Sequence, residues 1–256
     1  MNLLLVNDDG IHAEGIRVLA KELEKDHEVI IVAPEDQRSA QSQAITILKP
    51  LVIKEAQLEG VKSKAYSVSG TPADCVRVAL DKLIDKPVDM VLSGINMGLN
   101  VGMDVLYSGT VSAAIEANMY KIPSMALSAQ FVDGNVNYQI AAKYGKYILE
   151  KSKDDFIKNN IVLSINTPFL EEDQVKGVKV CKIGGVVYDY YIMEEDQDNG
   201  QMTLKLKGRK EQNLEEETDR FYLSQGYITI TPLYYDLTNF NLLEKVEGWL
   251  QNKNSN

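Results

Sequence analysis

Two adjacent carboxylates follow directly on an apolar segment near the start of the chain. The segment Leu3–Val6 is apolar, and the next four residues include Asp8 and Asp9 and end at Gly10. If the apolar segment is the first strand of an α/β fold, its carboxyl end faces the ligand crevice, where paired carboxylates are well placed to hold a cation. Asn, Asp and Gly also dominate ordinary turns, so this segment alone fits turn chemistry equally well.

A second group of polar residues follows the next apolar run. The segment from Ala33 to Ser42 is too long for a simple connection, and long loops in compact domains are usually functional or disordered. Arg38 could pair with a phosphate oxygen, and the Ser39 hydroxyl could bind a metal or a phosphate. An isolated Arg-Ser pair is more often solvated surface, so this loop indicates a site only in combination with the segments that follow the other strands.

The third candidate segment is rich in glycine and in oxygen ligands. Glycines at 94, 98, 102 and 109 let the backbone approach a ligand closely, while Asn96, Asn100 and Asp104 offer neutral and charged oxygens. Ser108, Gly109 and Thr110 then open a helical pattern, and the free N–H groups of a helix N-terminus favour a bound anion. Taken singly, Ser108 or Thr110 would be an ordinary N-cap. Three strand ends with such residues indicate a metal and phosphate site.

The elements that must position these residues alternate between strand and helix. The expected strands are 1–6, 29–32, 65–68, 88–92 and 124–128, and the expected helices are 14–23, 71–83, 111–120 and 137–151. This order predicts a Rossmann-like, doubly wound α/β fold, in which a mostly parallel sheet carries helices on both faces.

The C-terminal third has a different pattern. Strand-like runs are expected at 162–166, 178–183, 186–193, 202–206 and 227–231, followed by an amphipathic helix over 239–250. Asn199-Gly200 is a strong hairpin signal between two of the runs. We expect one α/β domain over 1–256, with a catalytic core over about 1–160 and an extension over about 161–256 whose hairpin and helix serve oligomerisation.

Composition excludes several classes of function. The chain has 256 residues and a formal net charge of −10, so its surface should repel duplex nucleic acid. No apolar run reaches the roughly 20 residues needed to cross a bilayer, and the N-terminus lacks a signal-like segment, so we expect a cytoplasmic protein. The two cysteines, Cys75 and Cys181, form no CxxC pair and are expected to be buried free thiols.

Familiar phosphate-handling motifs are missing from the sequence. There is no GxxxxGK[ST] loop and no GxGxxG spacing, no cysteine has an Arg six positions later, and the Asp pair lacks the second Asp at i+2 of aspartyl-phosphate enzymes. With two histidines in the whole chain, a histidine-rich zinc cluster is also excluded. Hard oxygen ligands instead suggest Mg²⁺ or Mn²⁺.

Several separated motifs together resemble the SurE family of survival-protein nucleotidases. The resemblance covers essentially the whole chain in consistent order. It rests on the segments 6–13 (VNDDGIHA), Ala33-Pro34, Arg38-Ser39, 69–76 (SGTPADCV), 93–96 (SGIN), 107–114 (YSGTVSAA) and 226–233 (GYITITPL).

The resemblance implies a metal-dependent phosphatase that acts on nucleoside 5′- and 3′-monophosphates, with some members also trimming short polyphosphate. Carried over residue by residue, it implies one divalent cation per subunit, Mg²⁺ or Mn²⁺, held by Asp8, Asp9, Ser39 and Asn96. Asp8 and Asp9 would be catalytic, and the cation would activate the attacking water. Ser39 and Asn96, with the segment 108–110, would also bind substrate. Family members are homodimers or homotetramers built through C-terminal extensions.

Two departures from the family pattern concern substrate preference. Residues 35–37 (Glu-Asp-Gln) replace a more basic, Asp-Arg-Asn-like run, and Glu14 stands where Pro is common. The added negative charge should disfavour polyanionic substrates, so we expect weak activity on polyphosphate.

Two rival functions would use the same crevice. A nucleotide-sugar transferase also binds a metal-held phosphate, but it usually needs a second nucleotide-binding domain, for which the C-terminal third is too small and too rich in hairpins. A non-enzymatic nucleotide sensor would bind AMP in a metal-dependent manner without releasing phosphate.

Overall fold

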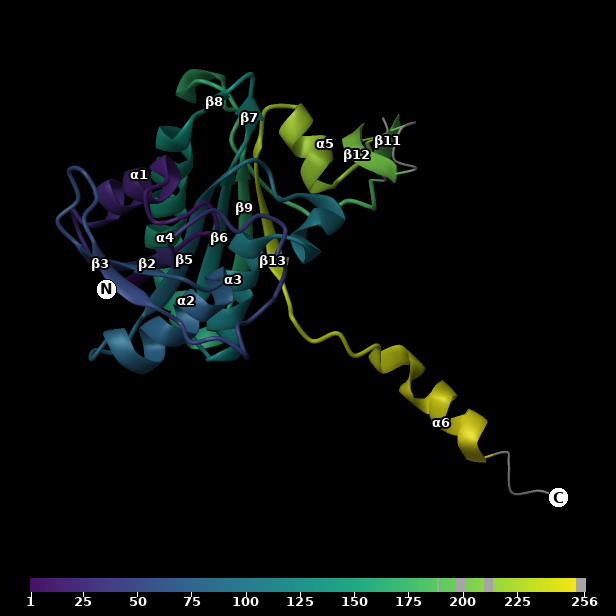
Figure 1. Ribbon diagram of the computed structural model, residues 1–256, viewed down its shortest axis with the longest axis horizontal. Helices are drawn as coiled ribbons and strands as arrows, with labels where there is room; N and C mark the ends of the chain where they lie inside the picture. Colours follow the sequence, from purple (N-terminus) through teal and green to yellow (C-terminus); the bar gives the residue numbers. More distant parts are fainter. Residues whose placement is uncertain (188, 197–200, 210–213, 252–256) are drawn as a thin grey trace.

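The protein is built on one large central sheet flanked by helices (Figure 1). A computed structural model describes residues 1–187, 189–196, 201–209 and 214–251. Within these residues the central sheet has nine strands in the order β10-β13-β9-β6-β5-β1-β2-β4-β3. Their bounds are β1 Asn2–Val6, β2 Glu28–Pro34, β3 Ile53–Ala56, β4 Lys64–Val68, β5 Met90–Met97, β6 Ser124–Ala129, β9 Val162–Thr167, β10 Val178–Val180 and β13 Ile228–Leu233.

Most neighbouring strands of this sheet run parallel, as the sequence predicts. β1 pairs in parallel with β2 on one side and β5 on the other, so the strand order reverses around β1. β3 is antiparallel to β4, and β13 is antiparallel to β9. In a doubly wound sheet the ligand crevice opens at the carboxyl ends of the strands where the order reverses, and β1 ends there one residue before the paired aspartates.

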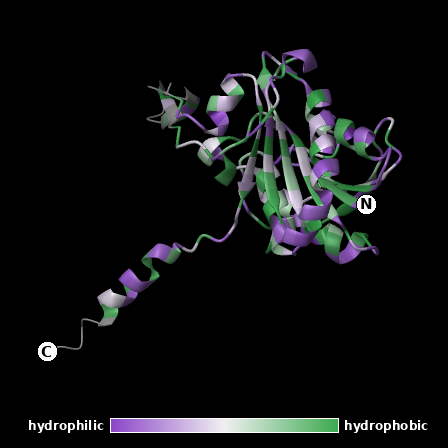
Figure 2. Ribbon diagram, turned by 180° about the vertical axis from the view of Figure 1, so that it is seen from behind, coloured by the Kyte–Doolittle hydropathy of each residue, from purple (hydrophilic) through white to green (hydrophobic). Residues whose placement is uncertain are grey.

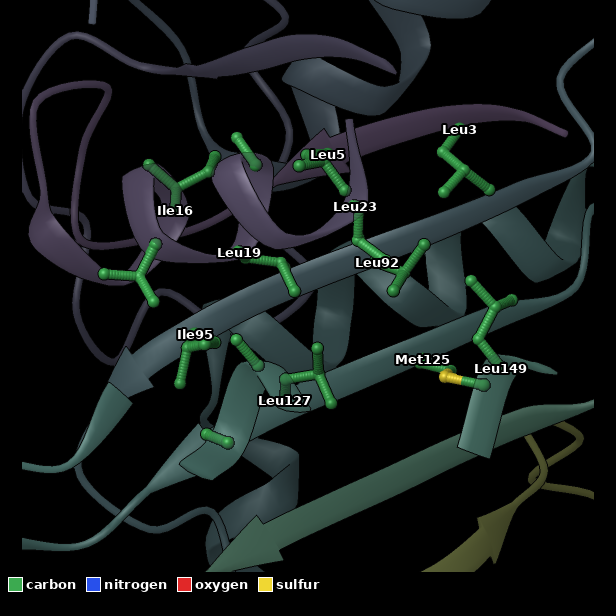
Figure 3. Packing of buried hydrophobic residues seen from close by; sticks show 14 of the residues in the cluster. Leu3, Leu5, Ile16, Leu19, Leu23, Leu92, Ile95, Met125, Leu127 and Leu149 are labelled. Carbon is green, nitrogen blue, oxygen red and sulfur yellow. The ribbon is translucent and has the colours of Figure 1, made fainter. Parts of the chain in front are cut away.

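Side chains that alternate along β1 enter two different cores. Leu3 and Leu5 pack with helices α1 (Glu14–Leu23) and α4 (Tyr138–Asn159), whereas Leu4 and Val6 pack with α2 (Pro72–Val78) and α3 (Gly109–Met119). Figure 3 shows the first core, where side chains of α1 and α4 meet those of the central strands. A strand covered on both faces is apolar throughout, which explains the unbroken run in the sequence.

Several elements differ in extent from their predicted bounds. β5 continues to Met97, so Gly94 and Asn96 lie within the strand rather than in the loop after it. α4 continues to Asn159 through a mostly polar, charged stretch, where the apolar periodicity fades although Phe156 is buried. The helix predicted over 71–83 is α2 followed by a π-helical turn over Ala79–Leu83.

Besides two 3₁₀ turns, Gly102–Leu106 and Glu172–Gln174, four short elements were not predicted. They are the edge strand β3, the small ribbon of β7 (Phe131–Val132) and β8 (Asn135–Val136), and helix α5 (Asp219–Ser224). Each is short, and none buries enough apolar surface to leave a periodic pattern in the sequence. One thiol also differs from expectation: both cysteines are free, but Cys181 is half-buried, because it lies just after edge strand β10, whereas Cys75 is fully buried.

The predicted hairpin is present as an antiparallel arm. β11 (Asp189–Asp196) pairs with β12 (Gln201–Arg209), ending with Asp196 opposite Gln201, and the predicted turn at Asn199-Gly200 lies outside the described residues. Helix α6 (Leu243–Gln251), preceded by a short 3₁₀ turn, projects away from the body at the C-terminal end of the described chain (Figures 1 and 2). Among the described helices, none has the length and apolar character needed to cross a bilayer.

Candidate active site

Asp8 is held at the carboxyl end of β1 by the first turn of α3. Its side chain is 4% exposed. The Thr110 hydroxyl donates a hydrogen bond to Oδ1 of Asp8. A Cβ atom added to Gly109 would lie 2.8 Å from the Cβ of Asp8 and 3.0 Å from its Oδ2. A glycine is therefore required at position 109 for the helix to approach the carboxylate this closely.

Asp9 is held by β5 and by the loop after β2. The backbone N–H of Met97 donates to Oδ2 of Asp9 at 2.9 Å, and the Gln37 side-chain amide donates to Oδ1 at 3.4 Å. Both contacts join segments far apart in the sequence. The polar turn at the end of β1 is thus oriented by two neighbouring segments, in addition to its own local bonds between Asn7 and Gly10.

The electrostatics of the pair favour a cationic ligand. Burial raises the pKa of Asp8 from 3.8 to about 6, with a further increase from the neighbouring charge of Asp9 and an opposing effect of the Thr110 hydrogen bond. Burial also raises the pKa of Asp9. Within the described part of the chain, no basic side chain forms an ion pair with either carboxylate. Two close carboxylates without a basic partner are the arrangement that a bound cation would stabilise.

Ser39 is held near Asp8 by a backbone hydrogen bond of the preceding residue. The N–H of Arg38 donates to the Asp8 carbonyl at 2.7 Å, which fixes the next residue, Ser39, near the end of β1. Ser39 is exposed, and Ala40 after it has a φ of 55°, so the chain turns sharply there. Arg38 itself turns inward: its Nη2 lies 3.5 Å from the Ser69 carbonyl, and among the described residues its buried Nε has no partner.

Asn96 directly precedes the residue of β5 whose backbone contacts Asp9. Its neighbour Met97 donates to Asp9, and the Asn96 side-chain amide donates to the Gly98 carbonyl at 2.9 Å. This bond fixes the orientation of the amide and leaves its oxygen free to act as a ligand. The side chain is half-buried, at the same edge of the sheet as the aspartates.

The segment 108–110 divides its hydrogen-bonding groups between the helix and Asp8. Ser108 is the N-cap of α3, and its hydroxyl accepts from the Val111 N–H at 3.1 Å. Thr110 is not a cap, because its hydroxyl is used by Asp8. The first N–H bonded within the helix is that of Ser112, so the Gly109 N–H precedes the helical hydrogen bonds and can donate to an anion.

The glycine loop is less uniform than its composition suggests. Asn100 is directed into the protein, where its backbone N–H donates to Oδ1 of Asn166 at 2.8 Å and its side-chain amide donates to the Ser128 hydroxyl at 2.9 Å. Asp104 forms an ion pair with Arg220 at 3.1 Å. Of the three oxygen-bearing side chains singled out in the sequence, that of Asn96 alone belongs to a residue adjacent to one that contacts an aspartate of the pair, Met97.

Two contributors to the site were not identified from the sequence. The Met97 N–H acts through the backbone, which has no residue-type signature. Gln37, which contacts Asp9, belongs to the run 35–37 that departs from the family pattern. That departure was the possible signal in the sequence. Across the described residues, no three His, Cys, Asp or Glu side chains gather in a metal-binding arrangement, so a cation at Asp8 and Asp9 would need neutral oxygens as its other ligands.

Comparison with known proteins gives a consistent result. The family described as "Survival protein SurE" matches residues 3–189. A protein named 5′-nucleotidase SurE from Clostridium botulinum (strain ATCC 19397 / Type A) is 55% identical over 248 residues, covering 96% of this chain and 98% of that protein. Its namesake from Clostridium tetani (strain Massachusetts / E88) is 51% identical over 249 residues, covering 97% and 100%.

A solved structure agrees with the sequence relatives. The crystal structure of the SurE protein from Aquifex aeolicus superimposes with a TM-score of 0.86 at 33% identity, covering 98% of this chain and 100% of that one. Sequence and fold thus match along nearly the whole length, and the chain belongs to the SurE family.

Proposed function

We propose that this chain is a divalent-metal-dependent phosphomonoesterase that releases phosphate from nucleoside 5′-monophosphates and also from 3′-monophosphates. Membership of a family whose relatives at 55% and 51% identity are named 5′-nucleotidase makes it a hydrolase of nucleoside monophosphates. The metal dependence, the 3′-activity and the residue roles are our inference. The observation that carries them is the pair Asp8 and Asp9, of which Asp8 is buried and Asp9 half-buried, and neither forms an ion pair with a basic side chain within the described residues.

The donor set fits Mg²⁺ or Mn²⁺. Asp8 and Asp9 would supply two carboxylates, and Ser39 and Asn96 would complete the set with a hydroxyl and an amide oxygen, which are hard ligands suited to these ions. When bound, one cation per subunit would neutralise charge on the phosphate and lower the pKa of a water molecule.

The roles of the surrounding residues follow from their contacts. Thr110 orients Asp8 through its hydroxyl, and the Met97 N–H and Gln37 orient Asp9. The Gly109 N–H at the start of α3, with the Ser39 and Ser108 hydroxyls, would donate to the phosphate oxygens, which carry the charge of a loose transition state. Preorganised donors and a fixed carboxylate pair supply positioning and electrostatic stabilisation, which is most of what phosphoryl transfer needs.

The subunit arrangement belongs to the same proposal. The β11–β12 arm and helix α6 extend from the body, and exposed apolar residues such as Leu204, Trp249 and Leu250 lie on them. We propose that these elements form the contacts of a homodimer or homotetramer.

The test is phosphate release by the wild-type protein. Inorganic phosphate is measured with 5′-AMP and with 3′-AMP, in the presence of Mg²⁺ or Mn²⁺ and in EDTA. The proposal predicts release from both nucleotides with metal and none in EDTA. Release that persists undiminished in EDTA would contradict the metal dependence, and saturable AMP binding without phosphate release would favour the sensor.

A further inference from the structure

The loop over residues 98–107 connects the two halves of the candidate site. It begins after β5, where the Met97 N–H contacts Asp9, and it ends at α3, where Thr110 contacts Asp8. The conformation of this loop therefore determines how Asn96 and the first turn of α3 lie relative to the aspartates. Its first half is anchored to the sheet, through the Gly98 N–H to the Ala129 carbonyl at 2.9 Å and through Asn100 to Asn166.

The second half of the loop is anchored by a carboxylate from the C-terminal third. Asp219, 2% exposed, accepts the Gly102 N–H at 2.7 Å with Oδ2. Its Oδ1 accepts the Gly184 N–H at 3.0 Å and the Arg220 N–H at 2.7 Å. Three chain segments that are distant in sequence thus converge on one buried carboxylate, whose charge the N–H donors satisfy.

Arg220 holds the same part of the loop from its outer side. Its Nη2 donates to the Val101 carbonyl at 3.2 Å and to Oδ2 of Asp104 at 3.1 Å. The ion pair is largely shielded from water, with the Arg220 and Asp104 side chains 17% and 19% exposed. A Cβ added to Gly102, which has a φ of +58°, would lie 3.0 Å from Nε and Nη2 of Arg220. The absence of a side chain at position 102 leaves room for the guanidinium.

These contacts also fix the base of the β11–β12 arm. The chain leaves the body after the bridge between Lys182 and Thr218, and the Asp219 N–H donates to the Lys182 carbonyl at 3.1 Å. An ion pair of 2.6 Å between Lys182 and Glu215 closes the same base without contacting the loop. Figure 1 shows α5 between the arm and the central sheet. Asp219 and Arg220 are thus the link between the arm and the loop over residues 98–107.

We propose that Asp219 and Arg220 are positioning residues for the hydrolysis, acting through the loop over residues 98–107 on Asn96 and on the first turn of α3. This inference rests on the proposed function. Neither residue contacts a group placed in the chemistry, so the effect is one of geometry. A displacement of about 1 Å in positioning groups can reduce turnover by about a hundredfold. Loss of the contacts that hold this loop should therefore have a measurable effect on kcat.

The test compares Arg220→Ala and Arg220→Lys with Lys182→Ala. The control removes an ion pair at the same arm base that does not touch the loop. Two readouts are measured: kcat and KM for 5′-AMP, and hydrogen exchange of the backbone amides over 98–107. We expect Arg220→Ala to reduce kcat about tenfold or more with a smaller change in KM, and to speed exchange in the loop. Arg220→Lys, which keeps the cation, should recover part of kcat, and Lys182→Ala should match the wild type in both readouts.

The outcomes separate this inference from the proposed function. Wild-type kcat in Arg220→Ala would overturn the positioning role, whether or not loop exchange changes. An equal loss of kcat in Lys182→Ala would also overturn it, because the effect would then belong to the arm base in general. A wild-type protein that releases no phosphate would contradict the proposed function instead. If Arg220→Ala does not fold, Gly102→Ala displaces the guanidinium while retaining it, and the same loss of kcat is expected.

Discussion

The Thr110 hydroxyl donates a hydrogen bond to the Asp8 carboxylate, across 102 positions of sequence. The bond joins the end of β1 to the first turn of α3, and it places a helix N-terminus against the more buried of the two carboxylates. Thr110 therefore orients a catalytic candidate, whereas its sequence position suggested direct contact with phosphate. The same proximity explains why the residue before it is glycine.

Removing this hydroxyl should impair turnover. Thr110→Val keeps the shape of the side chain but leaves Asp8 with one donor fewer, and we expect kcat for 5′-AMP to fall about tenfold to a hundredfold. Thr229→Val is the matched control, because Thr229 is equally buried and its hydroxyl has no partner among the described residues. Steady-state kinetics check this. Equal rates in Thr110→Val and the wild type would show that the bond is dispensable.

A methyl group at position 109 should be more damaging than one elsewhere. In Gly109→Ala the new Cβ would lie 2.8 Å from the Cβ of Asp8 and 3.1 Å from Cγ of Pro72, so either the helix or the aspartate must move. We expect kcat to fall about a hundredfold. Gly248→Ala, where nothing lies within 4 Å of the added atom, should remain fully active. Phosphate-release assays on both variants test this prediction. Full activity in Gly109→Ala would contradict a close approach of α3 to Asp8 at position 109.

The aspartate pair should lower the free energy of unfolding when no metal is present. The folded-state pKa of Asp8 is raised from 3.8 to about 6, so between these values the folded protein holds a proton that the unfolded chain releases. Stability therefore decreases as the pH rises through this window. Asp8→Asn has no proton to lose, and in EDTA its free energy of unfolding should exceed that of the wild type by on the order of 3 kcal/mol at about pH 7.

The comparison that checks this is urea unfolding of both proteins in EDTA. The difference between Asp8→Asn and the wild type should be small near about pH 3, where the Asp8 carboxyl is largely protonated in both the folded and the unfolded state, and it should grow toward about pH 7. A difference that is constant over this range would mean that the pKa of Asp8 is not raised by folding.

Charge beside the site should limit polyphosphate hydrolysis. Residues 35–37, which depart from the family pattern, include two acidic side chains. Glu35 forms an ion pair with Lys54 at 3.4 Å, whereas Asp36 is exposed. We expect the wild type to hydrolyse polyphosphate much more slowly than 5′-AMP, and Asp36→Asn to narrow the gap by a few-fold, more at low salt than at high salt. Rates with the two substrates at two ionic strengths provide the test. Comparable wild-type rates on both substrates would contradict this explanation.

The sequence predicted the elements whose periodicity is set by burial. The apolar run ending at Val6 and the helix Glu14–Leu23 were both predicted, because a strand covered on two faces and an amphipathic helix each leave a regular pattern. Candidate ligands could be proposed at three strand ends along one edge of a parallel sheet, and the resemblance to the SurE family then implied the set Asp8, Asp9, Ser39 and Asn96. The family assignment was confirmed by the comparisons, whereas the roles of the individual residues stay predictions.

What could not be predicted depends on backbone donors and on contacts distant in sequence. The Met97 N–H on Asp9 requires the true end of β5, five residues beyond the predicted one. Asp219 and Arg220 belong to a helix of six residues, too short for a periodic signal, and their partners in the loop over residues 98–107 lie more than a hundred positions away. Only the assembled fold brings these groups to the loop over residues 98–107.

The most direct test of the account is metal-dependent phosphate release by Asp9→Asn beside Asp36→Asn. Both substitutions remove one carboxylate from the same edge of the protein, but Asp9 alone belongs to the proposed metal site, whereas Asp36 is exposed. With Mg²⁺ or Mn²⁺ and 5′-AMP, we predict that Asp9→Asn loses nearly all activity while folded to the same extent as the wild type. Asp36→Asn should retain activity. Full activity in Asp9→Asn would contradict a nucleotidase centred on the paired aspartates.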